Sequence, residues 1–131
     1  TQETKPEPEE DPKPKASGAS LDSAKTLLRR GKTRQALDML EDLSSSQPNS
    51  GEVAFYRGKA AYAMGRNNDA IDQFERAINL GYGRASVYSE LGSAYMVQGN
   101  RSDAKKAYQK YLEIQPDGKT ADEIRSVLEN L

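Results

Sequence analysis

Glycine recurs at a fixed interval of 34 residues along most of this chain. Gly31, Gly65 and Gly99 are separated by this interval. Three further sets keep the same step: Ala36, Ala70 and Ala104; Leu40, Phe74 and Tyr108; and Pro48, Tyr82 and Pro116. The aligned positions define three consecutive units without insertions, at residues 17–50, 51–84 and 85–118. Such a repeat is typical of arrays in which one supersecondary unit is stacked on the next.

Each unit carries two stretches in which apolar residues recur at three- and four-residue spacing. This spacing places the apolar side chains on one face of an α-helix. The turn glycines divide each unit into two helices. The predicted helices lie around Leu21–Leu28 and Ala36–Leu43, and over Val53–Met64, Asp69–Leu80, Val87–Val97, Ala104–Ile114 and Ala121–Leu131. No alternating run typical of a strand is found, so the sequence predicts an all-α fold with seven helices.

The repeat resembles the tetratricopeptide repeat family, whose 34-residue pattern combines an aromatic residue, Leu-Gly, Tyr, Ala, a second aromatic and Pro. The third unit matches with Tyr88, Leu91, Gly92, Tyr95, Gly99, Ala104, Tyr108 and Pro116; the second with Gly58, Tyr62, Gly65, Ala70, Phe74 and Ala77; the first with Gly31, Ala36, Leu40 and Pro48. The first unit has Ala24 at the usual Gly. The resemblance covers residues 17–131 and implies a right-handed superhelical array of antiparallel helix pairs, an α-solenoid.

Small residues inside the predicted helices fit this packing. Gly58 and Gly92 lie mid-helix, where glycine costs up to about 1 kcal/mol relative to alanine. A close approach of the paired helix compensates for that cost, and Ala70 and Ala104 are small on the facing side. Substitution of either alanine by leucine is therefore expected to overpack the contact.

Two departures from the family pattern concern the contacts between units. The third unit has Tyr111 where the family prefers a small Ala, which predicts a neighbour other than a standard fourth repeat. The second unit has 81–83 Gly-Tyr-Gly in place of Pro, which predicts a flexible, glycine-capped turn. Residues 120–131 then predict a capping helix over the end of the array, opened by a capping box from Thr120 to Glu123.

The first 18 residues differ in composition from the rest. They alternate Pro, Glu and Lys without a large apolar side chain, so they cannot bury enough surface to become ordered. We expect residues 1–18 to be a disordered linker acting as an extended spacer, followed by a repeat domain at 19–131. A recognition motif for a proline-binding domain is the alternative.

The composition argues against catalysis, and against metals, nucleic acid and the membrane as partners. The chain has no Cys and no His, so it lacks thiol nucleophiles, imidazole bases and the usual transition-metal ligands. The net charge of −1 produces no field that attracts nucleic acid. No apolar run approaches the roughly 18–20 residues that span a bilayer. We therefore expect no enzyme activity, cofactor, metal, nucleic acid or direct membrane insertion.

Three charged clusters need an interpretation, and two of them have both a functional and a structural one. Asp38, Glu41 and Asp42 provide carboxylates for acid–base work or for a cation, but this cluster is expected to be a solvated helix face, and the acidic residues 9–11 a solvated linker. The basic run 29–32 provides a phosphate cradle or, as we prefer, cations at the C-terminal end of a helix dipole.

The remaining candidate site is the concave groove that the resemblance implies, built from the first helix of each unit. The matching positions hold Lys25, Leu28, Arg29, Phe55, Lys59, Tyr62, Ser89, Ser93 and Met96. With its three cations, apolar groups and hydroxyls, this surface suits an extended or helical segment of another protein that has apolar anchors and some negative charge. Phe55 is the expected anchor. Leu28, Tyr62 and Met96 could equally be packing between helices.

A subset of the family grips chaperone tails with a clamp of Lys, Asn and Arg. Lys25 and Tyr56 stand where that clamp has Asn, and Ser86 and Glu90 stand where it has Lys and Arg, so the resemblance does not extend to it. The alternative to a binding module is a domain that self-associates through its exposed faces, although a monomer is expected in isolation. A cytoplasmic location, or attachment to a membrane protein through a preceding segment, is the expected setting.

Overall fold

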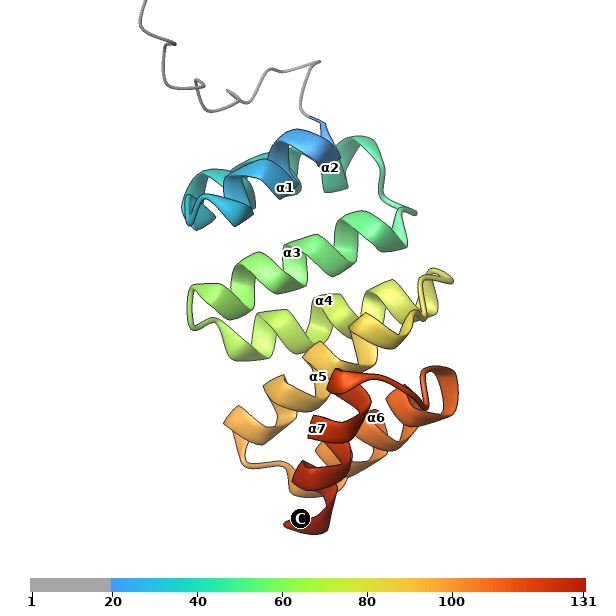
Figure 1. Ribbon diagram of the computed structural model, residues 1–131. Helices are drawn as coiled ribbons and strands as arrows, with labels where there is room; N and C mark the ends of the chain where they lie inside the picture. The colour runs from blue at the N-terminus through green and yellow to red at the C-terminus, as the bar shows by residue number, and fades with distance from the viewer. Residues whose placement is uncertain (1–19) are drawn as a thin grey trace, which may run out of the picture.

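The computed structural model describes residues 20–131, which form a row of antiparallel helical hairpins without strands (Figure 1). The helices are α1 (Leu21–Arg29), α2 (Thr33–Ser46), α3 (Gly51–Ala63), α4 (Asn67–Asn79), α5 (Ala85–Gln98), α6 (Arg101–Ile114) and α7 (Lys119–Glu129). The predicted all-α fold is confirmed, with each predicted helix in its place. The predicted linker at 1–18 lies outside the described residues. Within 20–131, no helix is both long and apolar enough to cross a membrane.

The turn glycines produce the hairpins. Gly31, Gly65 and Gly99 have φ values of +75°, +75° and +82°, which lie in the left-handed region that side chains disfavour. Each one follows the first helix of its unit and lets the chain reverse into the second. The regular spacing of the sequence is therefore a spacing of backbone reversals.

The mid-helix glycines mark the closest approach of paired helices. A Cβ built on Gly58 would lie 2.6 Å from Cε1 of Phe74, and one on Gly92 would lie 2.6 Å from Cε1 of Tyr108. Both rings therefore lie directly on a glycine backbone; the sequence predicted the close approach of the paired helices here but not that these two rings make it. The first unit has a larger Ala24 and a smaller Leu40 at the corresponding positions.

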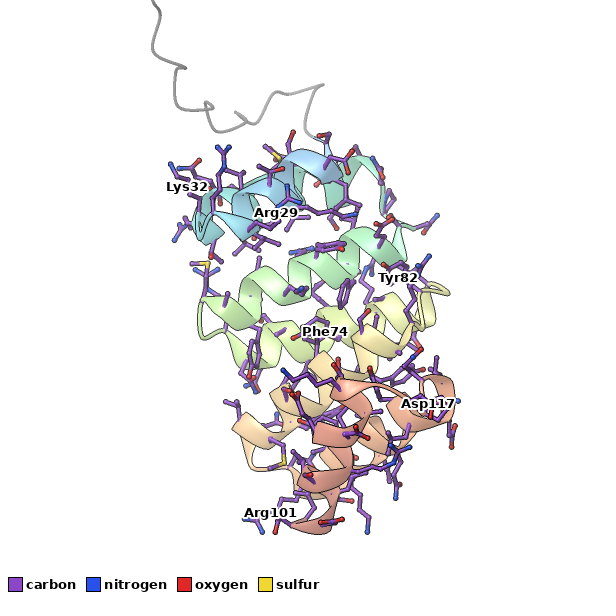
Figure 2. The ribbon with its side chains drawn as sticks, viewed as in Figure 1. Arg29, Lys32, Phe74, Tyr82, Arg101 and Asp117 are labelled. Atoms are coloured by element: carbon purple, nitrogen blue, oxygen red, sulfur yellow. The ribbon has the colours of Figure 1, made fainter. Side chains whose placement is uncertain are left out.

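Three hydrophobic clusters run through the array, and each one includes helices from two units or from a unit and α7. The central cluster contains Phe74, which Figure 2 places in the middle of the row. At the C-terminal end, Ala121 and Ile124 of α7 pack on Tyr108 and Tyr111 of α6. The prediction that Tyr111 faces a terminal capping helix is confirmed.

The predicted capping box at the start of α7 is wrong. The helix begins at Lys119 with Gly118 as its N-cap, and no side chain caps it. Gly118 has φ +111°, so the turn that starts the helix depends on this glycine. Thr120 is therefore already the second helical residue and cannot serve as a cap.

The second unit departs from the family pattern at two positions. Counting 34 residues back from Tyr95 leads to Ala61, so Tyr62, which aligns with Met96, is not the family tyrosine that the sequence analysis assigned. At the family proline position, Tyr82 folds back over α3. A Cβ on Gly51 would lie 2.6 Å from Cβ of Tyr82, and the Tyr82 and Phe55 ring centroids are 5.7 Å apart. Gly81, with φ +91°, ends α4 as expected for a glycine cap.

Candidate functional site

The first helices of the three units lie side by side along one surface of the array (Figure 1). Contacts join α1 to α3 and α3 to α5, so residues 34 apart form rows across this surface. We call the surface made by α1, α3 and α5 the groove. All nine residues that the sequence assigned to the candidate site lie on these three helices.

Lys25 joins the first unit to the second. Its Nζ lies 2.9 Å from Oε1 of Glu52 and 4.8 Å from the ring centroid of Tyr56. The hydrogen bond to Glu52 raises the pKa of Lys25. The charge of Lys25 is therefore already compensated by a carboxylate and an aromatic face on α3.

Lys59 repeats this arrangement between the second and third units. Its Nζ lies 4.0 Å from Oε1 of Glu90, and 5.6 Å and 5.8 Å from the ring centroids of Phe55 and Tyr56. Burial raises the pKa of Glu90, and the nearby Lys59 partly opposes that rise. Tyr56 is thus flanked by two lysines from different helices at the centre of the groove.

The structure corrects the expected role of Phe55. Its side chain is only 3% exposed and belongs to the central cluster. Its ring lies 5.9 Å from Phe74 and 5.0 Å from Tyr56, centroid to centroid. Because Phe55 is a core residue, it cannot act as an exposed anchor in this conformation. The adjacent Tyr56 is part-exposed.

The serine hydroxyls of α5 donate to backbone carbonyls of their own helix. Ser89 Oγ donates to the carbonyl of Ser86 at 3.0 Å, and Ser93 Oγ donates to the carbonyl of Ser89 at 3.1 Å. Ser93 Oγ also lies 3.2 Å from the hydroxyl of Tyr108. These contacts fix both serines, and each retains acceptor capacity at the groove surface.

Some apolar residues of the groove line a hollow, and others pack against the hydrophobic clusters. Leu28 and Arg29 line a hollow of about 260 Å³ together with Lys59. Tyr62 and Met96 are half-buried against the central and C-terminal clusters, respectively. These two residues therefore serve packing at least in part.

At its C-terminal end, the groove continues onto α7. Ser89, Glu90 and Ser93 share a hollow of about 300 Å³ with residues of α6 and α7. Its other lining residues are Tyr108, Thr120, Glu123, Ile124 and Val127. The capping helix thus extends the surface as well as covering the core, which the sequence analysis did not foresee.

The carboxylates of the groove were not predicted from the sequence. The groove was expected to carry the cations Lys25, Arg29 and Lys59, whereas the structure also places Glu52 and Glu90 opposite the two lysines. The available signal was position: Lys59 is 34 residues after Lys25, so a carboxylate partner for each was worth seeking on the following helix.

The acidic cluster on α2 and the basic run at the end of α1 lie at the surface of the described structure. Asp38, Glu41 and Asp42 are exposed on α2, and residues 20–131 contain no acidic group arranged to hold a metal ion. Residues 9–11 lie outside the described part of the chain. Arg29 lies in the last turn of α1 and donates to Thr26 Oγ1 at 3.0 Å, which is consistent with its predicted place at a helix C-terminus.

The fold is that of an α-solenoid built from helical hairpins. The sequence profile of the family described as "Tetratricopeptide repeat" matches residues 21–86 and 57–119. The chain belongs to the tetratricopeptide repeat family.

Solved structures with the same fold include MamA, the first tetratricopeptide repeat domain of Spaghetti (RPAP3) bound to the HSP90 peptide SRMEEVD, and the type III secretion translocator chaperone SycD of Yersinia enterocolitica. MamA is 30% identical with a TM-score of 0.70; the match covers 73% of this chain and 56% of the MamA chain, so this chain spans little more than half of that relative. The RPAP3 domain is 22% identical with a TM-score of 0.76, and the match covers 83% of this chain and 87% of the RPAP3 chain. SycD is 17% identical with a TM-score of 0.77, and the match covers 83% of this chain and 78% of the SycD chain. No curated protein sequence matches the chain significantly.

Proposed function

We propose that the groove binds a segment of another protein and that the domain is a non-enzymatic interaction module. The observation that carries this proposal is the position of Tyr56. Its half-buried ring lies at the centre of the groove, between Lys25 and Lys59, with hollows of about 260 and 300 Å³ elsewhere along the row. An aromatic residue surrounded by amphipathic neighbours is typical of an interface hot spot.

Peptide binding by other members of the fold supports the proposal. The first domain of RPAP3 is bound to an HSP90 peptide, and the second domain of human RPAP3 is in complex with the HSP70 peptide SGPTIEEVD. Both peptides end in the acidic sequence EEVD. In this chain Glu90 and Glu52 compensate the two groove lysines, so we expect a partner segment with apolar anchors and mixed charge. Residues 1–18 would act as the spacer that their composition predicts.

Photo-crosslinking from the full chain can test which surface of the domain the partner binds. A benzophenone side chain at Ser89 places the reactive group in the groove, and the same group at Lys106 of α6 places it away from the groove. We expect one defined adduct from position 89 and none from position 106. Crosslinking only from position 106 would move the site to the outer surface.

The energetic role of Tyr56 is tested with the partner so identified. We expect Tyr56→Ala to weaken binding by about 2 kcal/mol, roughly 30-fold, as for a central aromatic anchor. Lys110→Ala on α6 is the control and should leave affinity unchanged. Circular dichroism must first show that Tyr56→Ala is folded, because this ring contacts Phe55.

Self-association, the alternative function, has less support from the described surface. Among residues 20–131, the large hydrophobic side chains that are exposed are Val97 at 65% and Ile114 at 42%. They lie at the C-terminal parts of the antiparallel helices α5 and α6, and therefore at opposite ends of one hairpin. Separate side chains of this kind do not form the contiguous patch that marks an interface. A monomer by sedimentation at high concentration is the expected result.

A further inference from the structure

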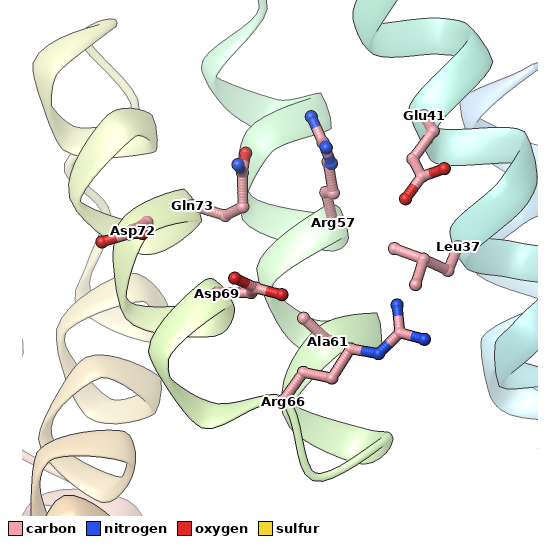
Figure 3. A pocket seen from close by; sticks show the side chains of 8 residues that line it. All are labelled: Leu37, Glu41, Arg57, Ala61, Arg66, Asp69, Asp72 and Gln73. Atoms are coloured by element: carbon pink, nitrogen blue, oxygen red, sulfur yellow. The ribbon is translucent and has the colours of Figure 1, made fainter.

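A pocket of about 160 Å³ opens between α2, α3 and α4, on a different side of α3 from the groove (Figure 3). Successive helical residues are about 100° apart, so Arg57 and Ala61 each lie about 200° from Lys59 around α3. The pocket is lined by Leu37, Glu41, Arg57, Ala61, Arg66, Asp69, Asp72 and Gln73. Figure 3 shows Ala61 in the middle of these side chains, with Glu41 on one side and Asp69 on the other.

The repeat explains why there is space at this place. The residue 34 positions after Ala61 is Tyr95, and the residue 34 positions before it is the buried Leu27. Alanine at this position therefore leaves open, in the second unit, space that the larger side chains of Leu27 and Tyr95 occupy in the units before and after it; beside Tyr95 a hollow of about 240 Å³ remains.

The third unit also shows how a tyrosine is held there. The hydroxyl of Tyr95 donates a hydrogen bond to Oε1 of Glu75, on the second helix of the preceding unit. Glu41 is the residue 34 positions before Glu75, and it lines the pocket. The second unit thus keeps the acceptor of this hydrogen bond while lacking the tyrosine that would donate to it.

We propose that the pocket at Ala61 receives a tyrosine side chain presented by a partner protein. The ring would occupy the space that the Tyr95 ring fills one unit later, with its hydroxyl donating to Glu41. A cavity of about 150 Å³ is known to hold a benzene ring, so the volume is sufficient. Gln73 Oε1, buried without a hydrogen-bond partner among the described residues, provides a second acceptor in the pocket wall.

The source of the tyrosine lies outside this chain. All seven tyrosines of the sequence lie within residues 20–131, none of them lines the pocket, and none is fully exposed for insertion into a second copy. This site is separate from the groove and does not depend on the function proposed for it.

The charges of the pocket favour an unmodified tyrosine. Three carboxylates (Glu41, Asp69 and Asp72) face two guanidinium groups (Arg57 and Arg66), so the lining carries one excess negative charge. A phosphotyrosine would bring close to two further negative charges against these carboxylates. Phosphorylation of the partner tyrosine is therefore expected to prevent binding.

The experiment is an NMR titration of the ¹⁵N-labelled full chain with N-acetyl-L-tyrosinamide. We expect saturable shifts centred on the amides of Leu37, Ala61 and Asp69. N-acetyl-L-phenylalaninamide, which lacks the hydroxyl, should bind at least tenfold more weakly, and the phosphotyrosine derivative should cause no saturable shift. An absence of saturable shifts with tyrosinamide, or equal binding of the phenylalanine derivative, would overturn the proposal.

Two variants locate the binding within the chain. Ala61→Tyr, which reproduces the third unit, should abolish binding and raise the melting temperature, whereas Ala63→Tyr, at an exposed position on the other side of α3, should leave binding intact. If Ala61→Tyr fails to fold, Ala61→Leu, which reproduces Leu27 of the first unit, blocks the same space. Tyrosinamide binding that persists in a folded, blocked variant would place the ligand elsewhere and reject the pocket.

Discussion

Gly58 and Gly92 are conformationally costly residues whose absent side chains provide space for an aromatic ring. The ring carbons of Phe74 and Tyr108 lie 2.6 Å from the places where a Cβ would be. In the first unit, the corresponding pair is Ala24 and Leu40, so the array contains two solutions to the same packing problem.

This pairing leads to a double-mutant prediction. Gly58→Ala should destabilise the domain by about 1–3 kcal/mol through overpacking, despite the better helix propensity of alanine. Combined with Phe74→Leu, which restores the pair found in the first unit, the same substitution should cost much less than it does alone. Urea denaturation of the four proteins gives the coupling energy. Additive effects would show that Phe74 does not determine the cost.

Glu90 predicts a particular dependence of stability on pH. Burial raises its pKa in the folded state above its ordinary value of 4.5. Because the folded state then holds the proton more tightly, the contribution of Glu90 to stability is complete below pH 4.5 and is lost as the pH rises through the raised value. Glu90→Gln removes this loss.

The stability of Glu90→Gln relative to the parent should therefore increase between pH 4 and pH 7. Lys59→Met should extend the effect to higher pH, because Lys59 lowers the pKa of Glu90. Denaturation midpoints across this range provide the measurement. A stability difference between Glu90→Gln and the parent that is constant with pH would contradict the assignment.

At the level of residues, the sequence predicts packing better than it predicts the site. Gly58 and Ala70 could be assigned to close contacts because the repeat fixes their neighbours. Phe55 could not be assigned correctly, because its burial depends on Tyr82, which folds back from the position where the family has proline. The lysine–carboxylate pairs also depend on rotamers that no periodicity specifies.

At the level of elements, the helices differ in how their first turns are stabilised. Ser20, Ser50 and Asn100 cap α1, α3 and α6 by accepting from the backbone amides of Ser23, Val53 and Asp103. In contrast, α2, α4, α5 and α7 have no side-chain cap, and the N-cap of α7 is Gly118. The missing cap of α7 could not be predicted from the sequence, because Thr120 and Glu123 have the spacing of a capping box but lie two residues after the N-cap position.

The difference between caps can be measured by two matched substitutions. Ser50→Ala should destabilise the domain by about 1 kcal/mol, because it leaves the amide of Val53 without its partner. Thr120→Ala should change stability by less than about 0.5 kcal/mol, as expected for an exposed residue without a capping role. Equal losses in the two variants would restore the capping box at Thr120.

At the level of the whole molecule, the array has a centre and two ends. The helices α3 and α4 pack against neighbours on both sides, whereas α1 and α7 each lie at an end of the described row (Figure 1). In a linear array, the stability of each unit depends on its own contacts and on those with its nearest neighbours. Opening is therefore expected to begin at the ends.

Hydrogen exchange of the full chain tests this expectation. Amides of α3 and α4 should exchange most slowly, and those of α1 and α7 should exchange by local opening at rates at least tenfold higher. Uniform protection along all seven described helices would indicate a single cooperative unit and contradict the linear picture.

The two lysine–glutamate pairs in the groove also give the domain a direction. In both pairs the lysine belongs to the earlier unit and the glutamate to the next, so the two charge dipoles point the same way along the array. A partner segment running along the groove in one direction would pass the lysine of each pair before its glutamate. A segment running in the opposite direction would pass the glutamate first. With the proposed binding of a partner segment in the groove, this arrangement would distinguish the two orientations of a charged segment and so give the complex a polarity.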